Sequence, residues 1–150
     1  MRIVIQRVLQ AHVSVDGNTV GAIENGLMIL AGFETGDKVA DLEWASKKIV
    51  QMRIFNDEGK VPNLSLMDVN GEILLVSQFT LHALIKKGNR PGYNKAAPPE
   101  LAKPLYEKFI SLLEIDLGKK IATGTFGADM KVMLINDGPV TILIDTKNKE

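Results

Sequence analysis

The stretch ILLVSQFTL, Ile73–Leu81, joins an apolar run to a short polar cluster. A continuous apolar run of this kind is typical of a strand that is covered on both faces. The hydroxyl and amide groups of Ser77–Thr80 follow where such a strand would end. Because the end of a buried strand is rigid, it is a suitable place to hold a small polar group. We therefore expect a candidate site at this cluster.

A second polar cluster, NDGPVT at Asn136–Thr141, lies between the apolar runs Val132–Ile135 and Ile142–Ile144. Its Asn-Asp-Gly-Pro sequence is common in turns and by itself predicts a tight connection between two strands. Neither cluster contains His, Cys or a pair of carboxylates. If a reaction takes place at either cluster, backbone groups and neutral side-chain donors must therefore carry most of it.

The N-terminal half combines strand and helix patterns. Alternating apolar residues over Ile3–Val15 predict a strand, and Asp16-Gly17-Asn18 predicts a hairpin turn after it. The apolar run Leu27–Phe33 predicts a second covered strand. Asp37 is suited to cap a helix. The residues expected on the buried face of this helix are Leu42, Ala45, Ile49 and Met52. The strand that leads to the first cluster is expected at Glu72–Phe79.

The C-terminal half continues with a second helix and three strands. Pro98 and Pro99 suit the start of the helix. Its expected buried stripe is Leu101, Leu105, Ile110 and Leu113. The strands are expected at Ile121–Phe126, Asp129–Asn136 and Val140–Asp145. Together these elements predict one domain, residues 1–150, of the α/β class, with a mixed, mostly antiparallel sheet rather than a doubly wound parallel one.

The composition excludes several kinds of chemistry. The chain has no Cys, which removes disulfides, thiolate nucleophiles and Cys-bound zinc. Its two histidines, His12 and His82, lack the spacing of a helical zinc motif, and we expect neither a metal nor another cofactor. The first residues do not resemble a secretory signal, and no apolar run approaches the roughly 18 residues that span a bilayer. We therefore expect a cytoplasmic protein.

Charge gives only a local indication of a nucleic-acid partner. Lys+Arg and Asp+Glu both total 18, so the formal net charge is zero. Any such partner would have to bind a local patch. The long loop Leu84–Pro99 is a candidate because it carries Lys86, Lys87 and Arg90. The same cations would also suit an ordinary solvated loop, and the residues alone leave both interpretations open.

The residues alone leave three roles open for the first cluster. Thr80 could be a nucleophile with His82 as its base, because alternate residues of a strand share a face. The amide of Gln78 and the backbone N–H groups of Phe79 and Thr80 could instead form an oxyanion site, where one donor is worth roughly 3–4 kcal/mol of barrier. The third interpretation is that these groups only satisfy hydrogen bonds at the end of a strand.

Seven segments, in order along the whole chain, match one family. The chain resembles the bacterial D-aminoacyl-tRNA deacylases, and Ser77–Leu81 and Asn136–Thr141 are two of the matching segments. The others are Met1-Arg2 with Gln6-Arg7-Val8, Arg53-Ile54-Phe55, Lys87–Pro91, Ala97–Glu100, and Thr123-Gly124 with Phe126–Ala128. The resemblance implies a three-layer α/β/β fold in which two main helices pack on one side of the sheets.

The resemblance also implies an activity. It predicts a cofactor-free enzyme that hydrolyses the ester between a D-amino acid and the terminal adenosine of tRNA. The catalytic wall would be formed by Ser77, Gln78, Phe79 and Thr80. Phe126 and Met130 would border the amino-acid pocket. The cations expected to contact tRNA are Lys86, Lys87 and Arg90.

A homodimer is part of what the resemblance implies. Gly138 and Pro139 would be joined by a cis peptide bond and would enter the active site of the partner subunit. There they would reject L-aminoacyl groups, so that the enzyme acts in chiral proofreading, while glycyl-tRNA, which lacks a side chain, would still be hydrolysed. Arg7 is the candidate for bracing the Gly-Pro loop.

Three residues depart from the pattern of the family. His82 stands where an aromatic residue is usual, and Leu84 and Ile85 replace a more polar pair, so the entrance loop is expected to differ. Two other functions remain open at this stage. One is a Thr80-dependent esterase that acts on small activated esters, and the other is a non-catalytic dimeric module that only binds tRNA ends or amino acids.

Overall fold

The computed structural model describes residues 1–150, and its sheet is organised around strand β1, Arg2–Val15. Strand β8, Lys131–Asp145, pairs antiparallel with one edge of β1 along almost its whole length. Strands β3, Gly26–Gly32, and β2, Asn18–Ile23, pair antiparallel with successive parts of β1 on its other edge. The expected hairpin between β1 and β2 is confirmed by a turn in which Asp16 and Gly17 both have positive φ.

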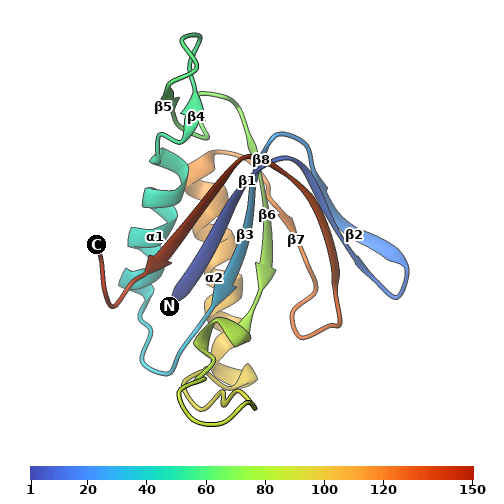
Figure 1. Ribbon diagram of the computed structural model, residues 1–150, viewed down its shortest axis with the longest axis vertical. Coiled ribbons are helices and arrows are strands. Elements are labelled where there is room, and N and C mark those ends of the chain that lie inside the picture. The colour runs from blue at the N-terminus through green and yellow to red at the C-terminus, as the bar shows by residue number, and fades with distance from the viewer.

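The sheet continues with two parallel pairings. Strand β6, Glu72–Ser77, lies parallel to β3, and the two-residue strand β7, Ala122–Thr123, lies parallel to β6 (Figure 1). A separate small hairpin joins β4, Phe55–Asn56, to β5, Pro62–Leu64. The sheet is therefore mixed and mostly antiparallel, as the sequence predicts.

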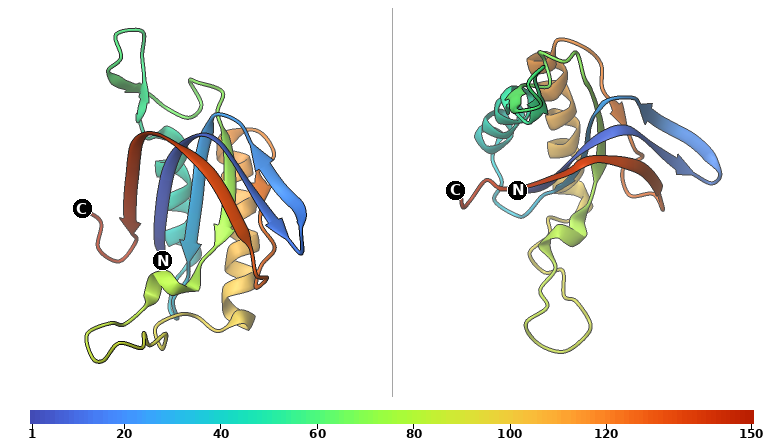
Figure 2. Two further views of the ribbon diagram at one scale, coloured as in Figure 1. Left: turned by 45° about the vertical axis from the view of Figure 1, so that its right-hand side comes forward. Right: turned by 45° about the horizontal axis from the view of Figure 1, so that its top comes forward.

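Two helices cover one face of the sheet. Helix α1, Val39–Gln51, and helix α2, Pro99–Leu117, pack against each other, and the right-hand view of Figure 2 shows both on the side opposite β2. Neither helix is long and apolar enough to cross a lipid bilayer. The two-helix layer confirms the predicted fold class.

Strand β6 is buried on both faces, as the apolar run predicts. Ile73 and Leu75 face a large core that includes both helices, whereas Leu74 and Val76 face a second, smaller core. The second core is closed by residues of β2, of the C-terminal half of β1 and of the N-terminal half of β8. Because successive side chains of a strand point to opposite faces, one short strand joins the two cores.

Two details of the helices differ from the predictions. Helix α1 begins at Val39 with Lys38 as its N-cap residue, and the carboxylate of Asp37 instead accepts hydrogen bonds from the Met1 ammonium group and the Glu34 N–H. In α2 Leu113 is buried as predicted, and Leu105 and Ile110 are partly buried against the core. Leu101 is 49% exposed. The buried residues of α2 are Ala102, Tyr106, Phe109, Leu113 and Leu117.

All three strands expected in the C-terminal part differ from the predictions. The strand expected at Ile121–Phe126 is limited to Ala122–Thr123. The strands expected at Asp129–Asn136 and Val140–Asp145 form one continuous strand, β8. The turn residues between them therefore lie inside a strand.

Four aspartates fix loops and strand ends through hydrogen bonds to their carboxylates. Burial acts to raise the pKa of Asp41 and Asp145, but the N–H groups of Lys38 and Lys147 and the side chains of Lys147 and Arg2 outweigh it and lower the pKa. The Val61 N–H lowers the pKa of Asp57, and the Ser65 hydroxyl lowers that of Asp68. All four groups therefore stabilise the fold in their ionised form.

These shifts predict a loss of stability in acid. A carboxyl whose pKa is lowered by folding stabilises the protein fully above its ordinary pKa, 3.8 here, and loses that contribution as the pH falls through the lowered value. We expect the free energy of unfolding, measured by urea titration, to fall steadily below about pH 4. The variant Asp68→Asn should make this fall shallower. A free energy that stays constant down to about pH 3 would contradict the prediction.

Candidate functional site

The first polar cluster lies where β6 ends. After Ser77 the backbone N–H of Gln78 donates to the carbonyl of Ala31, and the chain then leaves the sheet as a short 3₁₀ helix, η1, Phe79–His82. Gly32 allows this turn to lie against β3, since a Cβ at Gly32 would be 2.5 Å from the carbonyl oxygen of Gln78. The strand expected at Glu72–Phe79 is thus shorter, because its last two residues belong to the turn.

Gln78 and Thr80 are hydrogen-bonded to each other. The amide nitrogen of Gln78 donates to the hydroxyl oxygen of Thr80. The interpretation in which His82 acts as a base for Thr80 does not fit the structure, because these residues lie in a 3₁₀ helix and do not share a strand face. His82 is fully buried, and neither of its ring nitrogens has a hydrogen-bond partner. Thr80 therefore has no imidazole base.

A second segment faces the end of β6 and forms the other wall of a cavity. The cavity has a volume of about 310 Å³. Its first wall includes Ser77, Gln78 and Phe79, and its second wall includes Phe126 and Met130. The remaining lining residues are Val76, Gly127, Ala128, Asp129 and Val132. The structure thus brings five of the predicted site residues together, while Thr80 is hydrogen-bonded to Gln78 but is not part of the lining.

The second polar cluster is a bulge, not a turn. Gln6 of β1 pairs with Thr141, and Val8 pairs with Asn136, so Arg7 alone lies opposite four residues of β8. Within this bulge the Gly138-Pro139 peptide bond is cis, and Gly138 has a φ of 125°. Both residues are exposed. The Gly-Pro pair therefore projects from the sheet.

Arg7 is buried beneath this bulge. Its Nε donates to the carbonyl oxygen of Asp137 at 3.0 Å and lies 3.2 Å from the carboxylate of the same residue. Its Nη1 donates to the carbonyl oxygen of Ile54 at 2.5 Å. A Cβ at Gly138 would lie 3.0 Å from Nη2 of Arg7, so glycine fits closely over the guanidinium group. Arg7 thus links the bulge to the residue that directly precedes β4.

The two clusters lie far apart within the chain. Through β3, Ser77 is level with Ile3 of β1, whereas the bulge lies opposite Arg7. Four residues along a strand and three strand spacings across the sheet place the clusters about 20 Å apart. Figure 1 shows η1 below the lower end of the sheet and the bend of β8 at its upper end. Within one chain, Gly138 therefore lies far from the cavity.

The cationic loop extends beyond the same end of the sheet as the cavity. Lys86, Lys87 and Arg90 are all exposed, and a bridge between Leu84 and Gly92 closes the loop that carries them. Figure 2 shows this loop, in yellow-green, projecting from the body of the molecule. The loop therefore lies at the same end of the sheet as the cavity and away from the Gly-Pro bulge.

Two contacts near the site were not predicted from the sequence. The ring of Tyr93 packs edge-to-face on that of Phe79, with centroids 5.0 Å apart, and Phe79 is 56% exposed. The other is the close approach at Gly32. An aromatic residue among loop cations is a recognisable signal, but its partner depends on how the loop folds back.

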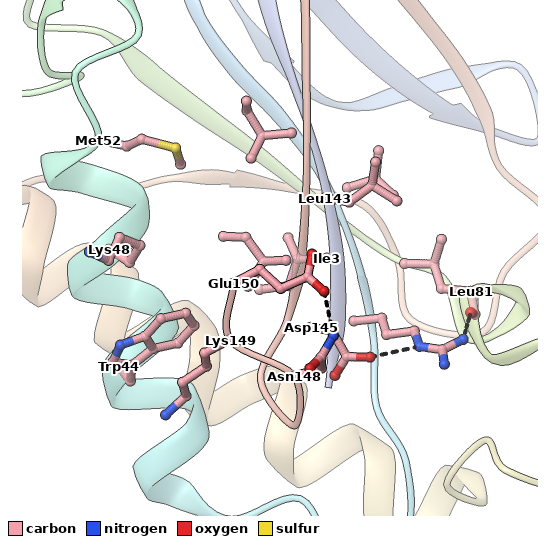
Figure 3. A pocket seen from close by; sticks show the side chains of 14 residues that line it. Ile3, Trp44, Lys48, Met52, Leu81, Leu143, Asp145, Asn148, Lys149 and Glu150 are labelled. Carbon is pink, nitrogen blue, oxygen red and sulfur yellow. Dashed lines mark hydrogen bonds and ion pairs between the residues drawn. The ribbon is translucent and has the colours of Figure 1, made fainter.

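A larger cavity lies elsewhere and shares only Leu81 with the two segments that contain the polar clusters. It measures about 520 Å³ and lies between α1 and the C-terminal half of β8 (Figure 3). Trp44, Leu143 and Lys149 are among its lining, and Arg2 bridges Asp145 to the Leu81 carbonyl at its rim. No group of three or more His, Cys, Asp or Glu side chains that could hold a metal occurs in the structure.

Comparison with known proteins places the chain in a family. The sequence model of the family described as D-Tyr-tRNA(Tyr) deacylase matches residues 4–145. The chain belongs to this deacylase family. A protein of Flavobacterium psychrophilum named D-aminoacyl-tRNA deacylase is 61% identical over the full length of both chains. A protein of Bacteroides fragilis with the same name is 59% identical, again over both full lengths.

Solved structures agree with this deacylase fold. A structure described as c-Myc DNA Unwinding Element Binding Protein is 40% identical, with a TM-score of 0.89, and the match covers 97% of this chain and 98% of the other. A probable eukaryotic D-amino acid tRNA deacylase shares the fold alone, at 19% identity and a TM-score of 0.83, over 95% and 97% of the two chains. The family predicted from the sequence, and the hydrolase class it implies, are confirmed.

The position of Arg7 in this deacylase predicts a large cost for its removal. In Arg7→Gln the Asp137 carboxylate and two carbonyl groups lose a buried cationic partner, although Asp137 stays partly solvated. We expect the free energy of unfolding, measured by urea denaturation, to fall by about 2 kcal/mol. The matched control is Arg2→Gln, which removes a half-exposed arginine and should cost less than about 1 kcal/mol. Equal costs for the two variants would contradict the bracing role.

Proposed function

We propose that the chain hydrolyses the ester bond of D-aminoacyl-tRNA and releases the free D-amino acid and tRNA. The observation that supports this most strongly is the cavity at the end of β6, which offers amide and backbone donors but no imidazole. Its one carboxylate, that of Asp129, is exposed and paired with Lys131. Relatives 55–61% identical over their full length carry the name of this activity. An aminoacyl ester is already activated, so positioning and oxyanion stabilisation suit its hydrolysis without a strong protein base.

The donors for the oxyanion come from the start of η1. The first N–H groups of a helical turn have no partner within the turn, so those of Phe79 and Thr80 are available to a substrate oxygen. The Gln78 side chain is held by the hydroxyl of Thr80. We assign Thr80 a positioning role rather than that of a nucleophile, because no base lies beside it. The 2′-hydroxyl of the terminal ribose would then assist the attacking water.

The Gly-Pro pair acts as the chirality gate in a homodimer. Because the bulge and the cavity of one subunit are about 20 Å apart, a second copy must supply Gly138 and Pro139 to each cavity. The exposed apolar side chains of Leu9, Met133 and Ile135 on β1 and β8 offer a surface for this copy. The carbonyl groups of the gate would bind the substrate's amino group and leave no room for an L side chain.

The remaining parts of the proposal concern the tRNA and the cellular location. Lys86, Lys87 and Arg90 would contact phosphates of the acceptor end, from a loop at the same end of the sheet as the cavity. A D side chain would point toward solvent, and glycine would pass the gate because it has no side chain. The protein would act in chiral proofreading in the cytoplasm, where aminoacyl-tRNA is made and used.

The direct test is the release of amino acid from charged tRNA. We expect rapid release from D-tyrosyl-tRNA, measurable release from glycyl-tRNA, and no release from L-tyrosyl-tRNA above a buffer control. Each substrate is assayed by the loss of radiolabelled aminoacyl-tRNA. Absence of release from the D-substrate would defeat the proposal, and tight binding without release would identify a non-catalytic module instead. Release from the L-substrate at the same rate would contradict the proposed role of Gly138 and Pro139 as a chirality gate.

Mixing of subunits tests the shared site. Gln78→Ala disables the catalytic wall, and Gly138→Ala forces a Cβ against Arg7 and Val140, so each homodimer is expected to be inactive. In a mixed dimer one site carries both changes and the other carries neither. Co-expressed subunits that assort at random should recover about a quarter of the wild-type activity. No recovery, although heterodimers are isolated by two different tags, would show that the gate does not act across subunits.

A further inference from the structure

Tyr106 connects α2 to the strand that forms the first wall of the cavity. Its side chain is buried in the middle of α2, with 3% exposure. The hydroxyl donates to the carbonyl oxygen of Leu75 at 3.0 Å. Leu75 precedes Ser77 by two residues in β6, so this hydrogen bond fixes the strand just before the polar cluster begins.

The same carbonyl oxygen also binds the second wall. The backbone N–H of Gly124 donates to the Leu75 oxygen at 3.0 Å, directly after β7 ends. The pairing of β6 with β7 involves only two residues on each strand. The Leu75 carbonyl is therefore a shared acceptor at the point where the two walls diverge to form the cavity.

The ring of Tyr106 contacts the second wall directly. Its centroid lies 5.6 Å from that of Phe126, with the rings tilted by 46°. On its other side the ring packs edge-on against Phe33, which directly follows β3. One side chain on α2 thus contacts Phe126 through its ring and the strand leading to Ser77 through its hydroxyl.

We propose that Tyr106 is a positioning residue that sets the spacing between the Ser77–Phe79 wall and the Phe126–Met130 wall. This inference rests on the proposed function for its effect on catalysis. The residue does not reach the cavity, so it acts through Leu75 and Phe126. A small misplacement of reacting groups costs catalytic rate steeply, and wall spacing should therefore affect kcat.

The hydroxyl is available as a donor over the whole useful pH range. Burial raises the pKa of Tyr106 to about 12. At neutral pH the group is therefore protonated, as donation to a carbonyl requires. Tyr106→Phe removes this hydrogen bond while it keeps the ring that contacts Phe126.

The first measurement compares Tyr106→Phe with a matched variant. Ser46→Ala also removes one buried hydroxyl donor, the one that binds the Asp116 carboxylate between the two helices at 2.6 Å, away from the cavity. Both variants should lose some thermal stability. At a temperature well below both melting points, we expect Tyr106→Phe to lower kcat for D-tyrosyl-tRNA about five- to tenfold, with KM changed less than about twofold. Ser46→Ala should leave kcat within about twofold of the wild type.

The second measurement does not depend on activity. In ¹⁵N NMR spectra of the folded protein, Tyr106→Phe should shift the amide resonances of both Ser77 and Phe126 and should speed hydrogen exchange at Gly124. Shifts on only one wall, or on neither, would overturn the inference, as would an unchanged kcat or an equal loss in Ser46→Ala. If the wild type releases no amino acid, the proposed function fails, and the NMR result alone decides whether Tyr106 sets the wall spacing.

Discussion

The burial of β6 on both faces is the constraint on which the rest of the structure depends. Ile73 and Leu75 pack toward the helices, and Leu74 and Val76 pack toward the second core. A strand fixed on both faces has little freedom to shift, because a slip of one residue would exchange its two sets of side chains. The polar residues that follow it are therefore held at one position relative to β3. The wall of the cavity that these residues form is rigid for the same reason.

Much of this could be predicted from the sequence, for a physical reason. The continuous apolar run before Ser77 has no polar side that could face solvent, so burial on both faces is the only favourable arrangement. The sequence does not mark where this strand ends. Gln78 and Phe79 have residue types that suit a strand, and the 3₁₀ helix forms because Gly32 on a neighbouring strand leaves room for it. Gly32 and Gln78 are 46 positions apart in the sequence, so the residues around Gln78 give no indication of this contact.

For the second cluster, Asn136–Thr141, the local sequence predicts the wrong structure. Asn-Asp-Gly-Pro has the composition of a turn, and no local signal distinguishes a turn from a bulge within one long strand. The difference is made by Arg7, which is buried opposite the bulge and binds the Asp137 carbonyl within it and the Ile54 carbonyl outside the sheet. Its role in bracing this loop came from resemblance to a family, whereas its burial and its contacts came only from the structure.

The separation of about 20 Å between the bulge and the cavity has a consequence for how the protein responds to dilution. Under the proposed arrangement a lone subunit contains two half-sites and no whole one. The number of working sites would then follow the square of the subunit concentration wherever dimers dissociate, and each dissociation would remove both sites at once. Rejection of L-amino acids would not be lost separately from hydrolysis, because the gate leaves together with the subunit that carries it. An isolated subunit would be inactive rather than indiscriminate, which protects correctly charged tRNA.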